Sequence, residues 1–351
     1  MGRRKKKVLA IVLASMTGLS VVTATSSIIA YEAMFPRYNR PNYALTSGEY
    51  YYERVKERLP RSEFYYPGVE GRLKGYYYES LQNKGLVIVV HGMHAGGDDY
   101  LPIIEYMVQS GYNVFSYDST GTYDSEGDDT VGMCQALIDL RKTIEYVKSI
   151  SSFSTMPLYL IGHSWGGYAV GSVLEFCKEV KACATIAGMN NGSTMMVEKA
   201  EEYVGKLAML PKPVFDGYQR ILFGDYVECS AVKGINSVNI PVLVAHGKED
   251  KVIRFDKQSI IAKRAEITNP NVAYYIGEGL QGDHNNIWHS KESAYYQKQV
   301  EKELKNLQKA KGEKLTDEEK ANFYKTVDHR LYSEVNKELM QKIVDMFSSA
   351  K

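Results

Sequence analysis

One serine of this chain stands in a setting that could make it a nucleophile. Ser164 occupies the centre of a Gly-x-Ser-x-Gly frame that runs from Gly162 to Gly166. The apolar residues 158–161 before this frame are typical of a buried strand, and the small-residue stretch 165–176 after it is typical of a helix. A tight turn between such a strand and such a helix holds the serine hydroxyl exposed above the sheet. Glycines suit the turn because a Cβ at either position would press against the crossing strand and helix.

A serine hydroxyl is a poor nucleophile at neutral pH, so the chain must also supply a base and a group that orients the base. His284, in a polar loop after the apolar stretch 272–276, is the predicted base, and His289 is the alternative. Asp250, in a short loop after the apolar stretch 240–245, is the predicted acid. The chain order is then serine, acid, histidine.

The other five histidines are given no part in the reaction. His91 and His246 each end an apolar strand as a His-Gly pair, and both are expected to bond within their own loops. His163 precedes the nucleophile and is expected to point the other way. His94 is a candidate pocket residue, and His329 lies in a charged helix.

A glycine-rich loop could stabilise the charge that forms on the substrate oxygen during acyl transfer. The apolar strand 86–90 is followed by the loop 91–97, in which three of the residues are glycines. Backbone N–H groups in such a loop can approach a reacting oxygen closely and hold it. The predicted donors are the N–H groups of Met93 and Trp165.

The elements that must position these residues alternate along the chain. Two strands near 63–66 and 73–79 come first, and from residue 86 onwards apolar strands alternate with amphipathic helices near 100–110 and 132–149. This alternation predicts right-handed crossovers and helices on both faces of a mostly parallel sheet. Ligands of such sheets bind beyond the carboxyl ends of the strands, where every candidate above falls.

Together these residues resemble the α/β-hydrolase superfamily and, within it, the serine aminopeptidase and monoacylglycerol-lipase branch. The resemblance covers about residues 63–290 and a final helix, and a strand that ends in Asp118 supports it. The branch usually has Arg where Thr120 stands, so this loop departs from the pattern. The resemblance implies the α/β-hydrolase fold, with a small helical cap, and the Ser-His-Asp machinery. The resemblance gives much weaker grounds for naming a substrate.

The predicted reaction is two-step acyl transfer through an acyl-enzyme, with a Ser164–His284–Asp250 triad. Carboxylic esters of apolar or lipid-like substrates are favoured, because esters need less help at the leaving group and the candidate cap is apolar. Two alternatives stay open. One is a serine peptidase of the aminopeptidase-like branch, and the other is a non-catalytic surface binding module.

The composition limits the classes of partner and cofactor that can be expected. The chain has 351 residues and a formal net charge of +1, which gives no reason to expect a nucleic-acid partner. It contains no Walker loop, dinucleotide fingerprint or metal-ligand spacing, so no cofactor or metal is expected. Its four cysteines fall on candidate core elements and on the inserted segment, and no disulfide is assigned. The sequence leaves the oligomeric state open.

The N-terminus has the pattern of an export segment. A basic cluster at residues 3–7 precedes residues 8–31, which contain no charged side chain. About 20 apolar residues suffice to span a bilayer. An uncleaved membrane anchor with the catalytic domain outside the cell is favoured. A secretory signal peptide, cleaved after residues 22–24, is the alternative.

The domain boundaries follow from these patterns. Residues 1–31 form the anchor or signal peptide, residues 32–62 a Tyr- and Arg-rich connector on the domain surface, and residues 63–351 the hydrolase domain. Two insertions are expected within this domain: a methionine-containing cap at about 189–239 and a charged helical insertion at about 291–328. A closing amphipathic helix is expected at 331–347.

Overall fold

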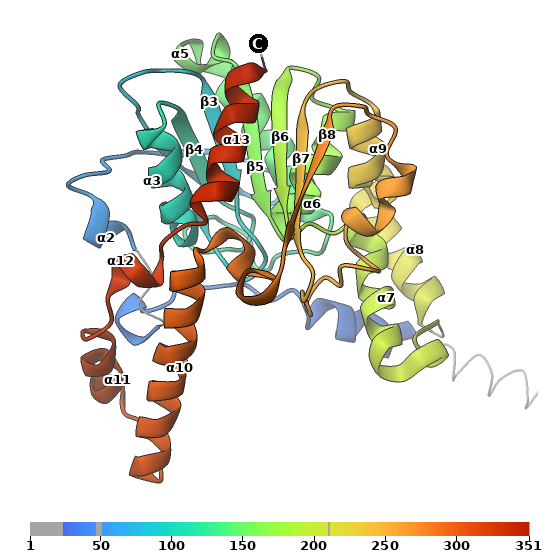
Figure 1. Cartoon of the computed structure of the whole chain (residues 1–351). Helices are drawn as coiled ribbons and strands as arrows, with labels where there is room; N and C mark the ends of the chain where they lie inside the picture. Colours follow the sequence, from blue (N-terminus) through green and yellow to red (C-terminus); the bar gives the residue numbers. More distant parts are fainter. Residues whose placement is uncertain (1–23, 47–50, 210, 351) are drawn as a thin grey trace, which may run out of the picture.

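A mostly parallel sheet forms the centre of the molecule (Figure 1). The computed structural model describes residues 24–46, 51–209 and 211–350. Within these ranges the sheet has eight strands in the order β1-β2-β4-β3-β5-β6-β7-β8. Strand β2 pairs antiparallel with both β1 and β4, and every other pairing is parallel. This confirms the predicted fold class.

The strands lie within two residues of their predicted positions at either end. Short apolar runs bounded by turn residues are typical of buried strands, so the apolar pattern located them well. Their bounds are β1 Ser62–Pro67, β2 Arg72–Tyr78, β3 Leu86–Val90, β4 Asn113–Asp118, β5 Leu158–His163, β6 Val180–Ile186, β7 Val242–Gly247 and β8 Val272–Gly277.

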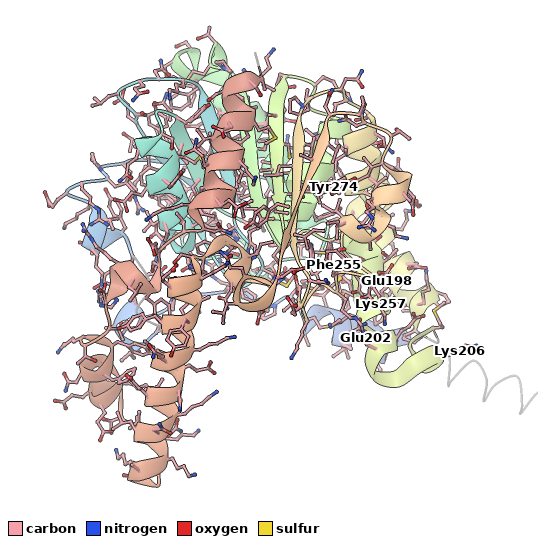
Figure 2. The ribbon with its side chains drawn as sticks, viewed as in Figure 1. Glu198, Glu202, Lys206, Phe255, Lys257 and Tyr274 are labelled. Carbon is pink, nitrogen blue, oxygen red and sulfur yellow. The ribbon has the colours of Figure 1, made fainter. Side chains whose placement is uncertain are left out.

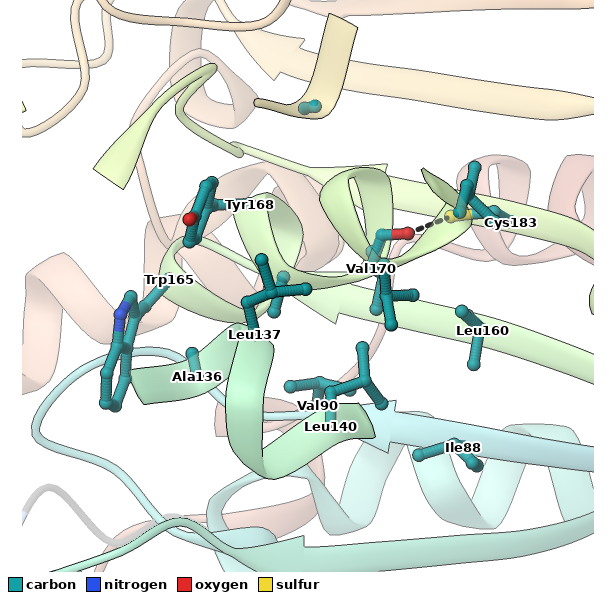
Figure 3. Close-up of a cluster of buried hydrophobic side chains, with 14 of the residues drawn as sticks. Ile88, Val90, Ala136, Leu137, Leu140, Leu160, Trp165, Tyr168, Val170 and Cys183 are labelled. Carbon is teal, nitrogen blue, oxygen red and sulfur yellow. Dashed lines mark hydrogen bonds between the residues drawn. The ribbon is translucent and has the colours of Figure 1, made fainter. Parts of the chain in front are cut away.

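Helices cover both faces of the sheet because successive strand side chains point to opposite faces. Ile88 and Val90 of β3 and Leu160 of β5 pack against one group of helices, as Figure 3 shows. That group comprises α4 (Gln135–Ser149), α6 (Trp165–Ser172) and α9 (Ala231–Asn236). The intervening residues Val87 and Val89 pack against α3 (Leu101–Gln109) and α13 (Lys337–Ser349). The core therefore has two layers, one on each side of the sheet.

Two helical insertions extend from the end of the sheet where the parallel strands finish (Figure 1). The first contains α7 (Gly192–Val204) and α8 (Lys212–Phe223), which we call the cap. The second contains α10 (Lys291–Lys311) and α11 (Asp317–Tyr324), which we call the arm. The sequence predicts a cap at about 189–239 and a charged helical insertion at about 291–328.

The connector differs from expectation in how tightly it is built into the domain. Residues 24–32 are helical, and the following chain forms short bridges from Pro36 to Asp129 and from Tyr38 to Thr122. The guanidinium of Arg37 donates hydrogen bonds to the carbonyl oxygens of Tyr123, Ser125 and Gly127 at 2.6–3.0 Å.

Among the described residues, no helix has both the length and the apolar character to cross a membrane. Most of the candidate anchor, residues 8–31, lies outside the described part of the chain. Of the candidate cleavage site at residues 22–24, only residue 24 is described.

Candidate active site

Ser164 stands at a strained turn between β5 and α6. Its φ of 56° and ψ of −115° lie in a region that residues with a side chain rarely adopt. The turn is also crowded, since a Cβ on Gly162 would lie 2.2 Å from the carbonyl oxygen of Gly166. A Cβ on Gly166 would lie equally close to the carbonyl oxygen of Val90. The two glycines therefore permit a turn that presents the Ser164 hydroxyl above the sheet.

The structure brings the predicted serine, histidine and aspartate together. The Ser164 hydroxyl lies 2.9 Å from Nε2 of His284. The Nδ1 atom of the same ring lies 2.7 Å from Oδ2 of Asp250. A carboxylate only accepts hydrogen bonds, so Nδ1–H donates to Asp250 and Nε2 is free to accept from the serine. His284 is thus poised to take the Ser164 proton. His289, the alternative base, is buried against Trp288.

Asp250 is held as a charged acceptor. Its Oδ1 accepts hydrogen bonds from the backbone N–H groups of Val252 and Ile253 at 2.8 and 2.9 Å. Burial alone would raise the pKa of Asp250, but hydrogen bonds from His246 and His284 outweigh it and hold that pKa well below its usual range. The carboxylate therefore stays ionised at neutral pH and fixes the orientation of the His284 ring.

His246 is the partner of Asp250 that the sequence did not reveal. The pattern predicted only a bond within its own loop, and that bond is present, from Nε2–H to the carbonyl oxygen of Ile253 at 2.8 Å. The same Nε2 atom lies 3.1 Å from Oδ2 of Asp250. His246 is fully buried, and it contacts the same carboxylate oxygen of Asp250 as His284 does.

The predicted oxyanion donors lie beside the serine. Met93 and Trp165 line the same cavity as Ser164. The Trp165 indole N–H donates to the carbonyl oxygen of Met133 at 2.6 Å, which fixes the first residue of α6. The next loop residue, His94, has a φ of 65°, and its ring lies against Tyr38 of the connector, with 4.2 Å between ring centroids. The loop is therefore supported from outside the predicted domain.

A buried chain of hydrogen bonds links this loop to the base. The carbonyl oxygen of His284 can only accept, so Nε2–H of His163 donates to it at 3.1 Å. Nδ1 of His163 is then an acceptor, and the Tyr100 hydroxyl donates to it at 2.7 Å. The same hydroxyl accepts from the N–H of Gly92 at 2.9 Å. Burial, followed by the nearby His284, lowers the pKa of His163 to about 3, so the ring is neutral.

A cavity of about 950 Å³ opens above Ser164. Six methionines contribute much of its apolar lining: Met34, Met93, Met133, Met189, Met195 and Met196. Unbranched methionine side chains adapt to apolar ligands of varied shape. The lining also includes polar residues of the connector, of α10 and of the short α12 (His329–Tyr332), among them Tyr43, Thr46, Gln297 and Tyr332.

The cap is fastened to the loop that carries Asp250. Glu202 of α7 lies 3.7 Å from the ammonium group of Lys257, and Figure 2 shows these two residues near each other. Glu202 also accepts hydrogen bonds from Lys199 at 3.0 Å and from Gln258 at 3.2 Å. Lys199 lines the cavity, so this contact fixes one wall of it.

The connector is the part of the site that sequence reasoning missed. Four of its residues, Met34, Pro41, Tyr43 and Thr46, line the cavity, although the pattern indicated only a surface segment. One signal was present: the connector is rich in Tyr and Arg and lacks the Gly and Ser content of a flexible linker. The four cysteines are all described, buried and free, in line with the absence of an assigned disulfide.

Comparisons with known proteins agree with this fold. Residues 82–220 match the family described as serine aminopeptidase, S33. The uncharacterized protein YfhR of Salmonella typhimurium is 27% identical over 195 residues, which cover 55% of this chain and 63% of YfhR. The lysophosphatidylserine lipase ABHD12 of Danio rerio is 26% identical over 190 residues, which cover 51% of this chain and 47% of the lipase. The chain thus spans less than two-thirds of the length of these relatives.

A solved structure shares the fold. The esterase Pf2001 of Pyrococcus furiosus superposes with a TM-score of 0.54 at 17% sequence identity, covering 78% of this chain and 98% of the esterase. At this identity the likeness concerns the fold. The sheet, the turn at Ser164 and these matches show that the chain has the α/β-hydrolase fold and that residues 82–220 are similar to the serine aminopeptidase family.

Proposed function

We propose that the protein is a serine hydrolase that cleaves carboxylic esters through an acyl-enzyme. The observation that carries this proposal is the continuous hydrogen-bonded arrangement of Ser164, His284 and Asp250 at the floor of a cavity. His284 removes the Ser164 proton as the serine attacks the ester carbonyl. The N–H groups of Met93 and Trp165 stabilise the oxyanion, and His284 then protonates the leaving alcohol. Water, activated by the same histidine, releases the acid.

The lining of the cavity supports an ester with an apolar acyl group. Its methionines offer a flexible apolar surface, whereas an aminopeptidase needs a carboxylate to hold a free α-amine. Among the described residues that line the cavity, the carboxylates are Asp99 and Asp283. Asp99 accepts from the Tyr123 hydroxyl at 2.6 Å, and Asp283 accepts from the His284 N–H at 2.6 Å. Both are engaged within the protein, which favours the ester over the peptide.

Labelling with a fluorophosphonate probe tests the nucleophile. We expect the full chain to be labelled, Ser164→Ala to be unlabelled, and Ser149→Ala, an exposed serine of α4, to be labelled like the wild type. Equal labelling of wild type and Ser164→Ala would show that the nucleophile is another residue. A folded wild type that takes no label would favour the binding-module alternative.

A substrate panel tests the reaction class. We expect short-chain and medium-chain acyl esters to be hydrolysed and aminoacyl amides to be cleaved far more slowly. We expect Asp250→Asn to lower kcat by about 10⁴, because the base loses the partner that sets its tautomer. Preferential cleavage of aminoacyl amides would replace the esterase proposal with the peptidase.

A further inference from the structure

The N-terminal helix is fixed to the cap. Tyr31, near the end of the helical residues 24–32, is fully buried. Its ring packs against Phe215 and Tyr218 of α8, with centroids 6.2 and 5.5 Å away, and against Phe35 at 4.9 Å. The hydroxyl of Tyr218 also donates to the carboxylate of Glu32. The helix therefore forms one body with the cap.

Only a few residues separate this helix from the cavity. Met34, only a few residues beyond the buried Tyr31, already lines the cavity. The carbonyl oxygen of Phe35 accepts from the N–H of Thr130 at 2.9 Å, which ties the chain to the catalytic domain. Residues 24–35 are therefore held at a fixed and short distance from the cavity.

Apolar side chains are exposed around this junction. Ile29 of the N-terminal helix is 63% exposed and Ile221 of α8 is 81% exposed. Met34 and Val252, both of which line the cavity, are 42% and 50% exposed. Figure 1 shows the N-terminal helix beside α7 and α8, at the end of the sheet that carries the site. An apolar surface next to a binding cavity is typical of a site that meets an apolar partner.

The sequence before the described residues indicates what the partner is. Residues 8–23 precede the described helix in the sequence and carry no charge, and a basic cluster stands before them at residues 3–7. A segment of this length and composition suits a bilayer. Because this segment joins the helix that packs on the cap, a bilayer that held the segment would lie next to the exposed apolar side chains.

We propose that the cap and the mouth of the cavity rest on the bilayer that holds the N-terminal segment, so that amphiphilic substrates enter the site from the lipid without crossing water. The surface contact rests on the packing of residues 24–35 and on the uncharged segment 8–23 that precedes them. The entry of an ester substrate rests, in addition, on the proposed hydrolase function. The two parts are separated by the experiments below.

Lipid contact is tested without any enzymatic assay. The full-length protein, as the single variants Ile221→Cys and Leu81→Cys, is labelled with an environment-sensitive fluorophore and reconstituted into vesicles of phosphatidylcholine and phosphatidylglycerol. Leu81 is fully exposed and precedes β3, at the end of the sheet opposite the site, so it serves as the matched control. The four native cysteines are buried and take little label.

We expect nitroxide-bearing lipids to quench the fluorophore at position 221 at least threefold more than the one at position 81. Equal quenching, or a chain that does not associate with the vesicles, would overturn the proposal. If a second copy covered the same face, fluorophores at position 221 would quench one another and lipid would not quench them, and this too would overturn it.

Substrate entry is tested by a linker insertion. About 15 glycine and serine residues between Thr25 and Ser26 add roughly 20 Å of flexible reach and free the cap from the bilayer. The same insertion after Gly312, where the φ is 75° and a Cβ would meet nothing within 4 Å, controls for added length. The two readouts are hydrolysis of a long-chain ester embedded in vesicles and of a short-chain ester in solution.

The insertion at Thr25 should lower the rate on the vesicle-embedded ester at least fivefold and leave the soluble ester unchanged. Unchanged rates on both esters would refute entry from the lipid. If the insertion also impairs the soluble ester, Ile221→Ser decides instead, since this exposed change should lower only the vesicle rate. Hydrolysis of neither ester by the wild type would refute the hydrolase function, while the quenching result would still stand.

Discussion

At the scale of single residues, the three side chains of the proposed triad are held in place by neighbouring residues that have no proposed part in the reaction. His163 was expected to point away from Ser164, and its ring does bond elsewhere, between Tyr100 and the backbone of His284. His246 likewise contacts the carboxylate of Asp250. These contacts join strands that are far apart in the sequence, and no spacing rule predicts them. The residue types in the triad could be found from the sequence, whereas their supports required the tertiary structure.

The first prediction concerns the chain from Gly92 through Tyr100 and His163 to His284. Tyr100→Phe removes one hydroxyl and leaves two buried polar atoms unpaired, at a cost of about 1–3 kcal/mol. If this chain positions the base and the oxyanion loop, kcat should fall about tenfold while KM stays the same. Steady-state kinetics on a soluble ester measure both.

Two substitutions of His163 separate positioning from packing. The amide of His163→Gln can reach the carbonyl oxygen of His284 and donate to it, whereas the shorter amide of His163→Asn cannot. Gln should therefore retain more of kcat than Asn. Equal losses in the two variants, or a change in KM alone, would mean that His163 only fills space.

The second prediction concerns His91, which is buried and neutral. Its Nδ1–H donates to the carbonyl oxygen of Gly92 at 2.7 Å, and its Nε2 accepts from the N–H of Ser119 at 2.9 Å. Protonation would break the second bond, and burial lowers the pKa of His91 to about 4. The unfolded chain binds this proton near pH 6.5, so acidification from pH 6.5 to 4 favours unfolding through this residue.

Comparison with His91→Gln isolates this effect, because the Gln carbonyl can still accept from Ser119 and does not titrate. The stability advantage of the wild type over the variant should shrink by about 2–3 kcal/mol between pH 6.5 and 4. Denaturant titrations of both proteins across this range measure it. A difference that does not vary with pH would show that His91 titrates normally in the folded protein.

At the scale of elements, apolar patterning located the strands and the turn at Ser164, because a fully buried parallel strand is a short unbroken apolar run. Strand β3 begins and ends where the sequence predicts, at Leu86–Val90. Helix ends were less certain: the closing helix was expected at 331–347, but α13 spans Lys337–Ser349 after the short α12 (His329–Tyr332). Asn336 accepts a hydrogen bond from the N–H of Leu339 and starts α13. A second capping residue, Asp328, starts α12.

The third prediction compares two glycines in helices. Gly166→Ala would place a Cβ 2.2 Å from a carbonyl oxygen of β3, so unfolding should become easier by about 3 kcal/mol or more and labelling of Ser164 should fail. Gly217→Ala in α8 meets nothing within 4 Å. That variant should gain about 0.5–1 kcal/mol, since alanine favours the helix. Thermal unfolding and probe labelling of both variants check this, and similar behaviour of the two would contradict the crowding argument.

At the scale of the whole molecule, the connector joins parts that the sequence presents as separate. Arg40 of the connector pairs with Asp98 in the loop after β3 and donates to Asp124 at 2.8 Å. It also donates to the hydroxyl of Tyr76 at 2.9 Å. The sequence could not reveal these pairs, because nothing in it distinguishes a charged residue that is buried from one that is exposed. Burial becomes visible only when the segment is seen against the sheet.

The fourth prediction follows from this cluster. Arg40→Met removes the cation beside the buried Asp118 and one of the two cations that pair with Asp98, which should cost about 3 kcal/mol of unfolding free energy. Burial raises the pKa of Asp118 to about 7, and Arg40 opposes this rise. Without Arg40 the charged form of Asp118 is disfavoured further. The loss should therefore be greater at pH 8, where this carboxyl must ionise, than at pH 5.5.

Arg72→Met provides the comparison for this experiment. Its partner Glu126 is exposed, and the Arg72 side chain is 61% exposed, so the loss should stay below about 1 kcal/mol. Denaturant unfolding at both pH values measures the two variants. Equal losses would show that the Arg40 cluster is no more than a surface ion pair.

The arm is expected to unfold locally before the rest of the described structure does. Its small core of Val300, Tyr324, Val327 and Tyr332 is separate from the two layers that cover the sheet. Local opening costs least where few apolar contacts must break. The outer half of α10 and the whole of α11 should therefore exchange amide hydrogens with solvent long before the sheet does. A protease would then cut first near the turn at Gly312, and a trimmed molecule with its sheet and site intact would remain.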